Sequence, residues 1–437
     1  NKSIKTVEQL RVDSFFGLIG IVFILGIAFL MSNNKKAINL RTVLVGLGLQ
    51  LFLAVFILKT SLGKAIFEGI GYFIKKLLDF SDDGGRFVFC FIADKPDLLT
   101  SIFGSSFIFA IKIIPTIIFI VVLVNIFYHL GIMQRVIAVI AKLMYKIMGV
   151  SGAEALSNVA SAFVGQVEAQ IMIKPYVAGM TRSELLASMS GSMACIAGGV
   201  MAIYISMGVP AEYLLAASIM AAPGALVISK IVYPETEKSE TKGEVKLKVE
   251  KTYVNLIDAI SHGASDGMRI SLSIIAMLIG LIALIAMIDW ILGFAGRLVV
   301  NWFHISSFLG LDFAHLSLRE ILGAIFSVFA YLMGVPFKEA ASVGGLMGTK
   351  LVLNEFVAYI DLLAMNSDGL LSQKSIVIAS FALCGFANLG SIAIQVGGIG
   401  EIAPNRKKDL AVLGVRALIC GTLASYLSAA IAGILVG

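Results

Sequence analysis

Nine long stretches of this chain contain no aspartate, glutamate, lysine or arginine, and this feature constrains the fold more than any other. A helix needs about 20 apolar residues to cross a bilayer. The stretches that approach or exceed this length are Ser14–Asn34, Thr42–Leu58, Ile113–Met133, Leu185–Ala211, Tyr213–Ser229, Ile270–Ile288, Ile321–Phe337, Ser375–Gly400 and Ala417–Gly437. Charged residues make up 14% of the chain, against about 25% in soluble domains. The sequence therefore predicts an all-α polytopic membrane protein.

The basic loops predict how the chain is oriented. Short loops rich in lysine and arginine stay in the cytoplasm. Three segments qualify: Lys35–Arg41, Pro234–Tyr253 and Arg406–Arg416. Placing all three in the cytoplasm puts both termini outside and requires eight transmembrane helices. One stretch must then fail to cross, and we assign this to Ile321–Phe337, because it ends in the turn signal Gly334-Val335-Pro336.

Three further stretches mix apolar and charged residues at helical spacing. They are Gly63–Phe80, Met133–Met148 and Val254–Gly267. Amphipathic helices of this kind can lie in the membrane interface, and ordinary connecting helices are the alternative. We expect the charged linker Pro234–Tyr253 to be solvated.

Two interrupted segments cannot cross the membrane simply. Ala155–Val167 has only 13 uncharged residues before Glu168, and the second segment contains Gly334-Val335-Pro336 and then Asn354-Glu355-Phe356. Irregular backbone at membrane depth survives only where it is buried in protein or lines a cavity. Each segment therefore predicts a re-entrant hairpin. By the orientation above, the first hairpin enters from the cytoplasm and the second from outside.

A similar glycine-rich stretch follows each interrupted segment. Ala187–Gly199 resembles Ala379–Ser391, and Ala194–Gly199 aligns with Phe386–Ser391. Together with the opposite hairpins, this similarity predicts an inverted repeat. Paired broken segments in two halves of a chain point to the substrate site of a secondary transporter. Chance similarity between glycine-rich helices is the alternative.

Glu168 and Glu355 are carboxylates inside otherwise apolar segments. A charged residue at the centre of a membrane helix costs about 2.5–3.5 kcal/mol on insertion scales, so it faces water, a partner or a ligand. A carboxylate accepts hydrogen bonds from sugar hydroxyls or from an N–H group. The alternative is a structural pair, of Glu168 with Lys174 or of Glu355 with Lys350.

Uncharged polar and aromatic residues add to these candidates. Gln166 and Asn388 each carry two amide donors and one acceptor oxygen, which suits a heterocyclic base edge or a sugar diol. Phe386 offers an apolar face to a flat ligand, although packing is the usual role of phenylalanine in a membrane helix. Lys112 lies at the start of an apolar run, and we treat it as structural.

The cysteines and histidines show no grouping typical of a metal site. They are Cys90, Cys195, Cys384, Cys420, His129, His262, His304 and His315. Their scattered positions argue against a disulfide framework or a zinc site, and we expect no cofactor. The net charge of +6 comes from residues between apolar runs, so it does not indicate a nucleic-acid polymer as partner.

Several short segments resemble the concentrative nucleoside transporter family. The most specific are Phe163–Glu168 and Cys384–Asn388. The others are Lys35–Asn39, Ile196–Val200, Ala221–Gly224, Pro234–Glu237 and Asn354–Tyr359. Each segment alone is a weak signal. All of them in order over nearly the whole chain make the resemblance specific.

The resemblance implies an inward-moving, cation-coupled nucleoside symporter of the plasma (inner) membrane. The family's fold has eight transmembrane helices, two oppositely oriented re-entrant hairpins and a homotrimeric assembly. Its substrate contacts carry over by motif. The base-side positions are Gln166, Val167, Glu168 and Val200; the ribose-side positions are Glu355, Asn388 and Ser391, with Phe386 beside the base.

The chain departs from the family's sodium-coupled pattern at several of these positions. Ser161 stands in place of a sodium-ligating asparagine, Val167 in place of threonine, and Cys195 in place of a serine ligand. Sodium is a hard cation that prefers oxygen, as hard cations do, and a thiol is a poor substitute. The carbonyls of Val164 and Ile196 remain available to the cation site that the resemblance implies.

Serine at position 161 is similar to the proton-coupled bacterial branch of the family. We therefore expect protons to drive uptake at least as well as sodium, with Glu168 as the group that takes up the proton. Sodium remains the alternative, held by the Ser161 hydroxyl, the two carbonyls and water.

The expected organisation has four parts. Residues 1–150 form scaffold helices TM1–TM3 with interfacial helices, and residues 151–233 form the first repeat, with hairpin 1, TM4 and TM5. Residues 234–318 contain the cytoplasmic linker, an interfacial helix and TM6. Residues 319–437 form the second repeat, with hairpin 2, TM7 and TM8.

Two other classes of function compete with a carrier. A channel for small polar solutes is disfavoured, because the polar residues cluster at two tips and do not line one continuous path. A membrane-embedded enzyme could use Glu168 and Glu355 as an acid–base pair, but no histidine and aspartate metal set accompanies them.

Overall fold

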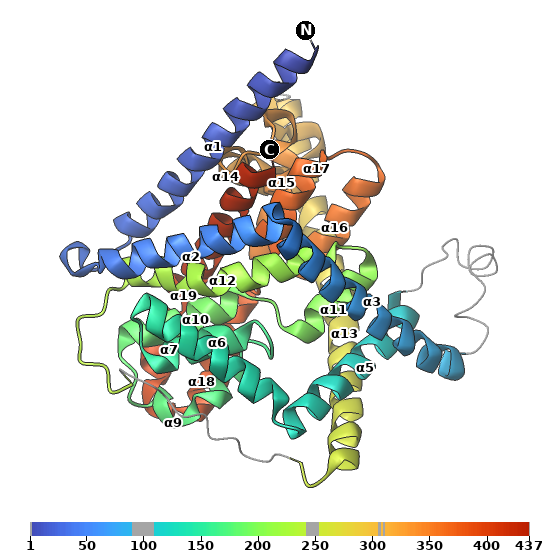
Figure 1. Ribbon diagram of the computed structural model, residues 1–437. Helices are drawn as coiled ribbons and strands as arrows, with labels where there is room; N and C mark the ends of the chain where they lie inside the picture. Colours follow the sequence, from blue (N-terminus) through green and yellow to red (C-terminus); the bar gives the residue numbers. More distant parts are fainter. Residues whose placement is uncertain (1, 90–108, 242–252, 305–306, 309–310, 437) are drawn as a thin grey trace.

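The computed structural model describes residues 2–89, 109–241, 253–304, 307–308 and 311–436, and these residues are almost entirely helical. The exception is a short antiparallel ladder between β1 (Ser307–Phe308) and β2 (Leu311–Asp312). The predicted all-α architecture is therefore confirmed (Figure 1). Cys90 and residues 242–252 of the linker lie outside the described residues.

The helices differ widely in length. Up to residue 148 they are α1 (Lys2–Leu30), η1 (Lys35–Ala37), α2 (Leu40–Lys59), α3 (Ser61–Phe89), α5 (Phe109–His129) and α6 (Ile132–Met148). Next come α7 (Gly152–Ser161), α8 (Glu168–Met172), α9 (Lys174–Val177), α10 (Arg182–Ala194), α11 (Gly198–Met207), α12 (Ala211–Val232) and α13 (Leu256–Phe303). The last are η3 (Phe313–His315), α14 (Leu318–Leu332), α15 (Phe337–Val352), α16 (Glu355–Ser367), α17 (Gln373–Leu383), α18 (Leu389–Ile402), η4 (Pro404–Arg406) and α19 (Lys407–Val436).

Length and composition mark several helices of the described chain as candidate membrane spans. Five pass this test alone, or up to seven if each of two bent helix pairs is one span. The five are Leu40–Lys59, Arg182–Met207, Ala211–Val232, Leu256–Trp302 and Pro404–Val436. The eight predicted crossings therefore stay a prediction.

The predicted turn at Gly334-Val335-Pro336 is confirmed. The chain bends by 118° between α14 and α15, and Gly334 has a φ of +99°, a conformation that glycine adopts without steric penalty. A second break, at Leu353 and Asn354, separates α15 from α16. Ile321–Phe337 thus contains a sharp turn in place of a continuous helix.

Residues 132–232 and 318–436 follow the same order of elements. An amphipathic helix comes first (α6 or α14) and ends near a glycine with positive φ, Gly149 or Gly334. Short arms follow (α7 with α8 and α9, or α15 with α16), then a broken helix (α10 and α11, or α17 and α18), then a long apolar helix (α12 or α19). The order of elements agrees with a repeat, and its predicted inversion stays a prediction.

The helix α19 lies at the centre of the packing. It contacts α1, α10, α12, α17 and α18, and nearly every residue from Ala417 to Gly433 is buried. A helix that is buried on all sides and apolar all round belongs to the interior of a helical assembly. The two broken helices are therefore held against one common partner.

The helix α13 differs from the expectation. Val254–Gly267 was expected to form a separate interfacial helix, but the chain runs on in one helix from Leu256 to Phe303, 48 residues. Gly263 and Gly267 do not end the helix, and both lie against α5. A Cβ on Gly263 would lie 2.8 Å from Val122 Cα, and one on Gly267 would lie 2.6 Å from Ile118 Cα.

The first part of the linker is docked, which also differs from the expectation that it is solvated. Ser239 Oγ and Thr241 Oγ1 donate hydrogen bonds to Glu184 Oε1 over 2.5 and 2.6 Å. Thr181 Oγ1 donates to Glu235 Oε2 over 2.7 Å. Residues 234–241 therefore lie against the start of α10.

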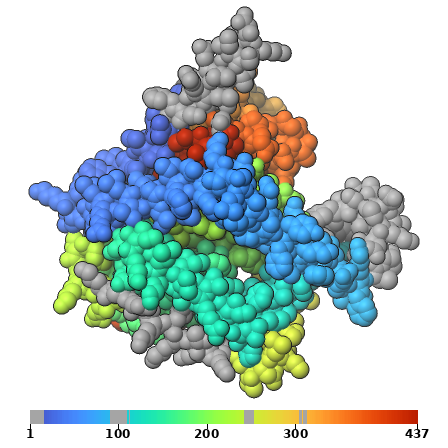
Figure 2. Space-filling view, viewed as in Figure 1, coloured from blue at the N-terminus to red at the C-terminus, as the bar shows by residue number. Residues whose placement is uncertain are grey.

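Large apolar side chains are exposed on the outer helices. Figure 2 shows α2 and α3 crossing one face of the molecule above α6. On α2 and α3 the most exposed of these residues are Leu40, Leu44, Phe52, Leu62, Tyr72, Phe73, Phe87 and Val88. Such a surface is typical of a protein that faces lipid or a partner subunit.

Candidate functional site

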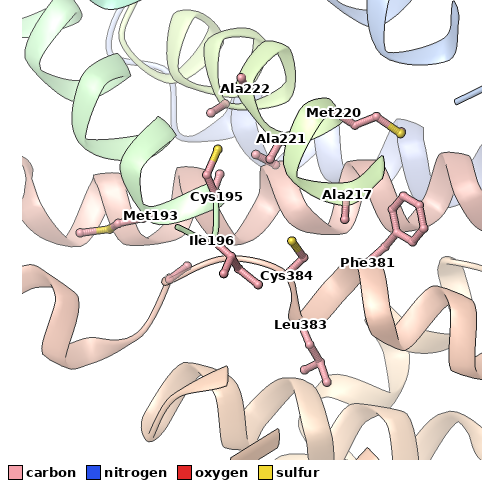
Figure 3. Packing of buried hydrophobic residues seen from close by; sticks show 14 of the residues in the cluster. Met193, Cys195, Ile196, Ala217, Met220, Ala221, Ala222, Phe381, Leu383 and Cys384 are labelled. Atoms are coloured by element: carbon pink, nitrogen blue, oxygen red, sulfur yellow. The ribbon is translucent and has the colours of Figure 1, made fainter. Parts of the chain in front are cut away.

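Two helix breaks from distant parts of the chain meet in the core. The first break, Cys195 to Ala197, separates α10 from α11, and the second, Cys384 to Asn388, separates α17 from α18. The Phe386 backbone N–H donates a hydrogen bond to the Cys195 carbonyl over 3.3 Å. Figure 3 shows Cys195 and Ile196 of the first break close to Cys384 of the second.

Gly385 allows this close approach. It has a φ of +128°, and a Cβ there would lie 2.6 Å from the Ala194 carbonyl oxygen. Any larger residue would meet both backbone strain and a steric clash. Glycine is therefore needed at position 385 because two broken helices make contact there.

The tip of the first predicted hairpin packs against the first break. Residues 162–167 connect α7 to α8, and the Gly198 N–H donates to the Phe163 carbonyl over 3.1 Å. Gly165 has a φ of +117°, and a Cβ there would lie 2.6 Å from Glu168 Oε2. Gln166 and Val167 are half-buried, Val200 is half-buried on α11, and the Glu168 side chain is exposed.

The second hairpin tip places Glu355 in a different environment. Glu355 opens α16 and is 5% exposed. Tyr204 Oη donates a 2.9 Å hydrogen bond to Glu355 Oε1, and Asn388 Nδ2 lies 3.5 Å from Glu355 Oε2. The carboxylate thus joins α11, α16 and the second break.

Neither predicted structural ion pair is found in the described part of the chain. Lys350 Nζ donates to the Ala382 carbonyl over 2.8 Å and is not within ion-pair distance of Glu355. Lys174 likewise forms no ion pair with Glu168 among the described residues. The two carboxylates are therefore not explained by these pairs.

Asn388 and Ser391 form the N-terminal cap of α18. Asn388 Oδ1 accepts a hydrogen bond from the Ser391 N–H over 2.9 Å, and the Ser391 hydroxyl lies 3.2 Å from the same oxygen. Ser391 Oγ also donates to the Phe386 carbonyl. The cap leaves the Asn388 amino group directed at Glu355, while the Phe386 side chain is half-buried.

Of the candidate cation residues, Cys195 and Ile196 contact Ser218 of α12, and Ser161 contacts Ser157 and Ser192. Ser161 is 1% exposed, donates to the Ser157 carbonyl over 2.7 Å, and lies 2.8 Å from Ser192 Oγ. The Cys195 thiol lies 3.8 Å from the Ser218 carbonyl, and Figure 3 shows its sulfur turned toward α12. The backbone N–H and carbonyl of Ile196 both lie 3.4 Å from Ser218 Oγ. Val164 lies at the hairpin tip.

Gln395 belongs to this region, and the sequence reasoning missed it. Its side chain on α18 is fully buried. Nε2 donates to the Met189 carbonyl over 3.2 Å and lies 3.5 Å from Gln166 Oε1. One turn earlier on the same face of α18 lies Ser391, so helical spacing from Ser391 was the signal that could have found it.

Three family models match the chain. "Na+ dependent nucleoside transporter N-terminus" matches residues 19–92, "Nucleoside recognition" matches residues 110–211, and "Na+ dependent nucleoside transporter C-terminus" matches residues 213–433. Together they cover most of the chain.

Similar proteins extend over nearly the full length. "Uncharacterized transporter YutK" of Bacillus subtilis (strain 168) is 44% identical over 422 residues, which are 96% of this chain and 99% of the relative. "Nucleoside permease NupC" of Helicobacter pylori is 40% identical over 429 residues, 97% and 98% of the two chains. A solved structure described as "Structure of CNTnw in an inward-facing substrate-bound state" is 40% identical, with a TM-score of 0.88 and 98% coverage of both chains.

Proposed function

The chain belongs to the concentrative nucleoside transporter family, and from this premise we propose that it imports nucleosides across the plasma (inner) membrane as a cation-coupled symporter. The observation that carries the proposal is the buried Glu355 carboxylate beside the second helix break. It accepts one strong hydrogen bond, from Tyr204, and a carboxylate has about four acceptor positions. The remaining positions suit two neighbouring ribose hydroxyls.

The substrate site combines the two tips and the two breaks. On the ribose side, Glu355 accepts from the hydroxyls, while Asn388 and Ser391 fix the start of α18 next to it. On the base side, Gln166, Val167 and Glu168 come from the first tip and Val200 from α11. Phe386 lies beside the base. This division is supported by Asn388 Nδ2, which reaches toward Glu355 from the second break.

Alternating access follows from the same arrangement. Residues 151–233 and 319–437 form the two repeats, and their hairpins enter the membrane from opposite sides. They move together against a scaffold made of residues 1–150 and 234–318, within a homotrimer. The shared order of elements and the packing of both broken helices on α19 support this proposal. Repeats of this kind place the substrate near the middle of the membrane.

For the coupling ion we propose that protons drive uptake at least as well as sodium, with Glu168 as the proton-binding group. Two contacts support this choice. The Cys195 thiol carries no oxygen and faces α12, and the Ser161 hydroxyl is already engaged by Ser157 and Ser192. Sodium is the alternative, because two matching family models are named for Na+ dependence.

Uptake by purified protein in proteoliposomes tests the proposal, with a proton gradient or a sodium gradient imposed alone. We expect uridine or adenosine to accumulate with the proton gradient in sodium-free buffer, and a protonophore to abolish accumulation. Strict dependence on sodium at every pH overturns the proton assignment. Cation flux that does not need nucleoside indicates a channel. The related proteins are transporters and permeases, not enzymes, so recovery of unmodified nucleoside is expected.

A further inference from the structure

The amide of Gln395 has a fixed orientation. The Met189 carbonyl can only accept a hydrogen bond, so the Gln395 group that faces it over 3.2 Å must be the Nε2 amino group. If the amide were turned over, two oxygens would face each other in a buried site. The orientation is thus set by a backbone atom on α10 and does not depend on the substrate.

This fixed donor also sets the amide of Gln166. The same Nε2 lies 3.5 Å from Gln166 Oε1, so the oxygen of Gln166 is the atom that turns toward α18. Its Nε2 amino group then faces away from Gln395. Val167, the next residue of the tip, also contacts α18, because a Cβ on Gly398 would lie 2.9 Å from Val167 Cγ1.

Gln395 is not explained by packing alone. Its Oε1 is buried and has no hydrogen-bond partner among the described residues. Buried polar atoms without partners are rare and call for a reason. An apolar residue of similar size would fill the same volume but would supply neither the donor to the Met189 carbonyl nor the donor that faces Gln166 Oε1.

We propose that Gln395 is a specificity-determining residue that holds Gln166 with its amino group toward the nucleobase. The transporter then favours bases that present a hydrogen-bond acceptor to Gln166. Gln395 does not touch the substrate and acts by positioning Gln166. This inference rests on the proposed nucleoside transport, and it adds the feature of the base that is recognised.

Pairs of nucleosides that differ at one acceptor test the proposal. Suitable pairs are adenosine with its 3-deaza and 7-deaza analogues, because each analogue lacks one ring nitrogen that accepts a hydrogen bond. Competition against labelled nucleoside uptake in proteoliposomes gives the affinity ratio for each pair. We expect at least one pair to favour the acceptor by about tenfold in the unmodified protein, as one hydrogen bond allows.

The variant Gln395→Leu removes the fixed donor, so this ratio should fall toward one while uptake persists. Gln166→Glu removes the amino group itself and should give the same change, even if a Gln395 variant fails to fold. The matched control is Gln50→Leu. Gln50 is also fully buried, donates to the Met220 carbonyl over 3.0 Å, and has an unpaired Oε1, but it lies on α2.

Four results decide between these outcomes. A fall in the ratio with Gln395→Leu or Gln166→Glu, and not with Gln50→Leu, supports the proposal. Unchanged ratios for every pair in folded variants overturn it, as does an equal change in the control. Absence of any nucleoside uptake by the unmodified protein refutes the proposed function itself, which keeps the two failures distinguishable.

Discussion

The tips of the two predicted hairpins occupy the same place in the order of elements but hold their carboxylates differently. Glu168 and Glu355 are each the first residue of the helix that follows a tip. The first tip, residues 162–167, is longer and leaves Glu168 exposed. The second is only Leu353 and Asn354, and it leaves Glu355 5% exposed.

The helix caps also show that the second tip is held more firmly than the first. Asn354 caps α16 by accepting a hydrogen bond from the Val357 N–H over 3.0 Å, and Tyr204 fixes one oxygen of Glu355. Val167, the corresponding residue of the first tip, provides no side-chain cap. The second tip is therefore the more preorganised of the two, as the proposed binding of a constant group such as ribose requires, and the less firmly held first tip suits the proposed binding of different bases.

The largest expected effect is at the second tip. Glu355→Gln should weaken nucleoside binding by about 10- to 150-fold, since a hydrogen bond to a charged group contributes about 1.5–3 kcal/mol. Titration calorimetry on purified protein measures this loss. Glu320→Gln is the control, because Glu320 caps α14 away from the site. Unchanged affinity in folded Glu355→Gln would remove Glu355 from the ribose site.

The next largest effect is expected when hydroxyl groups are removed from the ligand. Loss of the 2′- or 3′-hydroxyl is expected to weaken binding by about tenfold or more, and loss of the 5′-hydroxyl by less, since a site built around a hydroxyl is left with unpaired polar groups when it is missing. Competition with the deoxynucleoside series measures each step. Equal inhibition by all members contradicts a ribose site around Glu355.

Tyr204→Phe should have a smaller effect, about 2- to 13-fold in affinity, because it removes one hydrogen bond of about 0.5–1.5 kcal/mol and keeps the ring. Tyr204 also packs on Tyr359, with ring centroids 4.7 Å apart. Tyr359→Phe is the control: it removes a hydrogen bond to the Ser380 carbonyl, so it should lower thermal stability and spare affinity. An equal loss of affinity in both variants contradicts a specific role of the hydrogen bond from Tyr204 to Glu355.

The smallest expected effect is at the first tip. Gly165→Ala places a Cβ against Glu168 Oε2 and strains a φ of +117°, so it should shift uptake between purine and pyrimidine nucleosides by about threefold, or about 0.7 kcal/mol. Gly131→Ala carries similar strain, with a φ of +70° but no atom within 4 Å. The measurement is the ratio of purine to pyrimidine nucleoside uptake in each variant. The same shift in both variants shows that strain, and not Glu168, is the cause.

Local signals in the sequence predicted much of the fold. The uncharged stretches predicted helices, and Gly334-Val335-Pro336 predicted the turn between α14 and α15. The expected helix Val254–Gly267 was wrong as a separate element, because Gly263 and Gly267 serve contact with α5. Glycine in a sequence does not reveal whether it ends a helix or admits a neighbour.

The site was harder to predict than the fold, because its contacts join distant residues. Gln395 meets Gln166 across 229 positions of sequence, and Tyr204 meets Glu355 across 151. Cys195 was placed at the expected cation site by motif, yet its thiol faces α12. Side-chain direction at a helix break depends on packing, which no spacing rule predicts.

The length of α13 has a mechanical consequence. Its 48 residues extend about 72 Å at about 1.5 Å per residue, more than twice the roughly 30 Å hydrocarbon thickness of a bilayer. Part of this helix must therefore project into water or run obliquely to the membrane normal. Gly263 and Gly267 bring its backbone against α5, so the two helices support each other along this contact, as the fixed scaffold of the proposed alternating-access cycle requires.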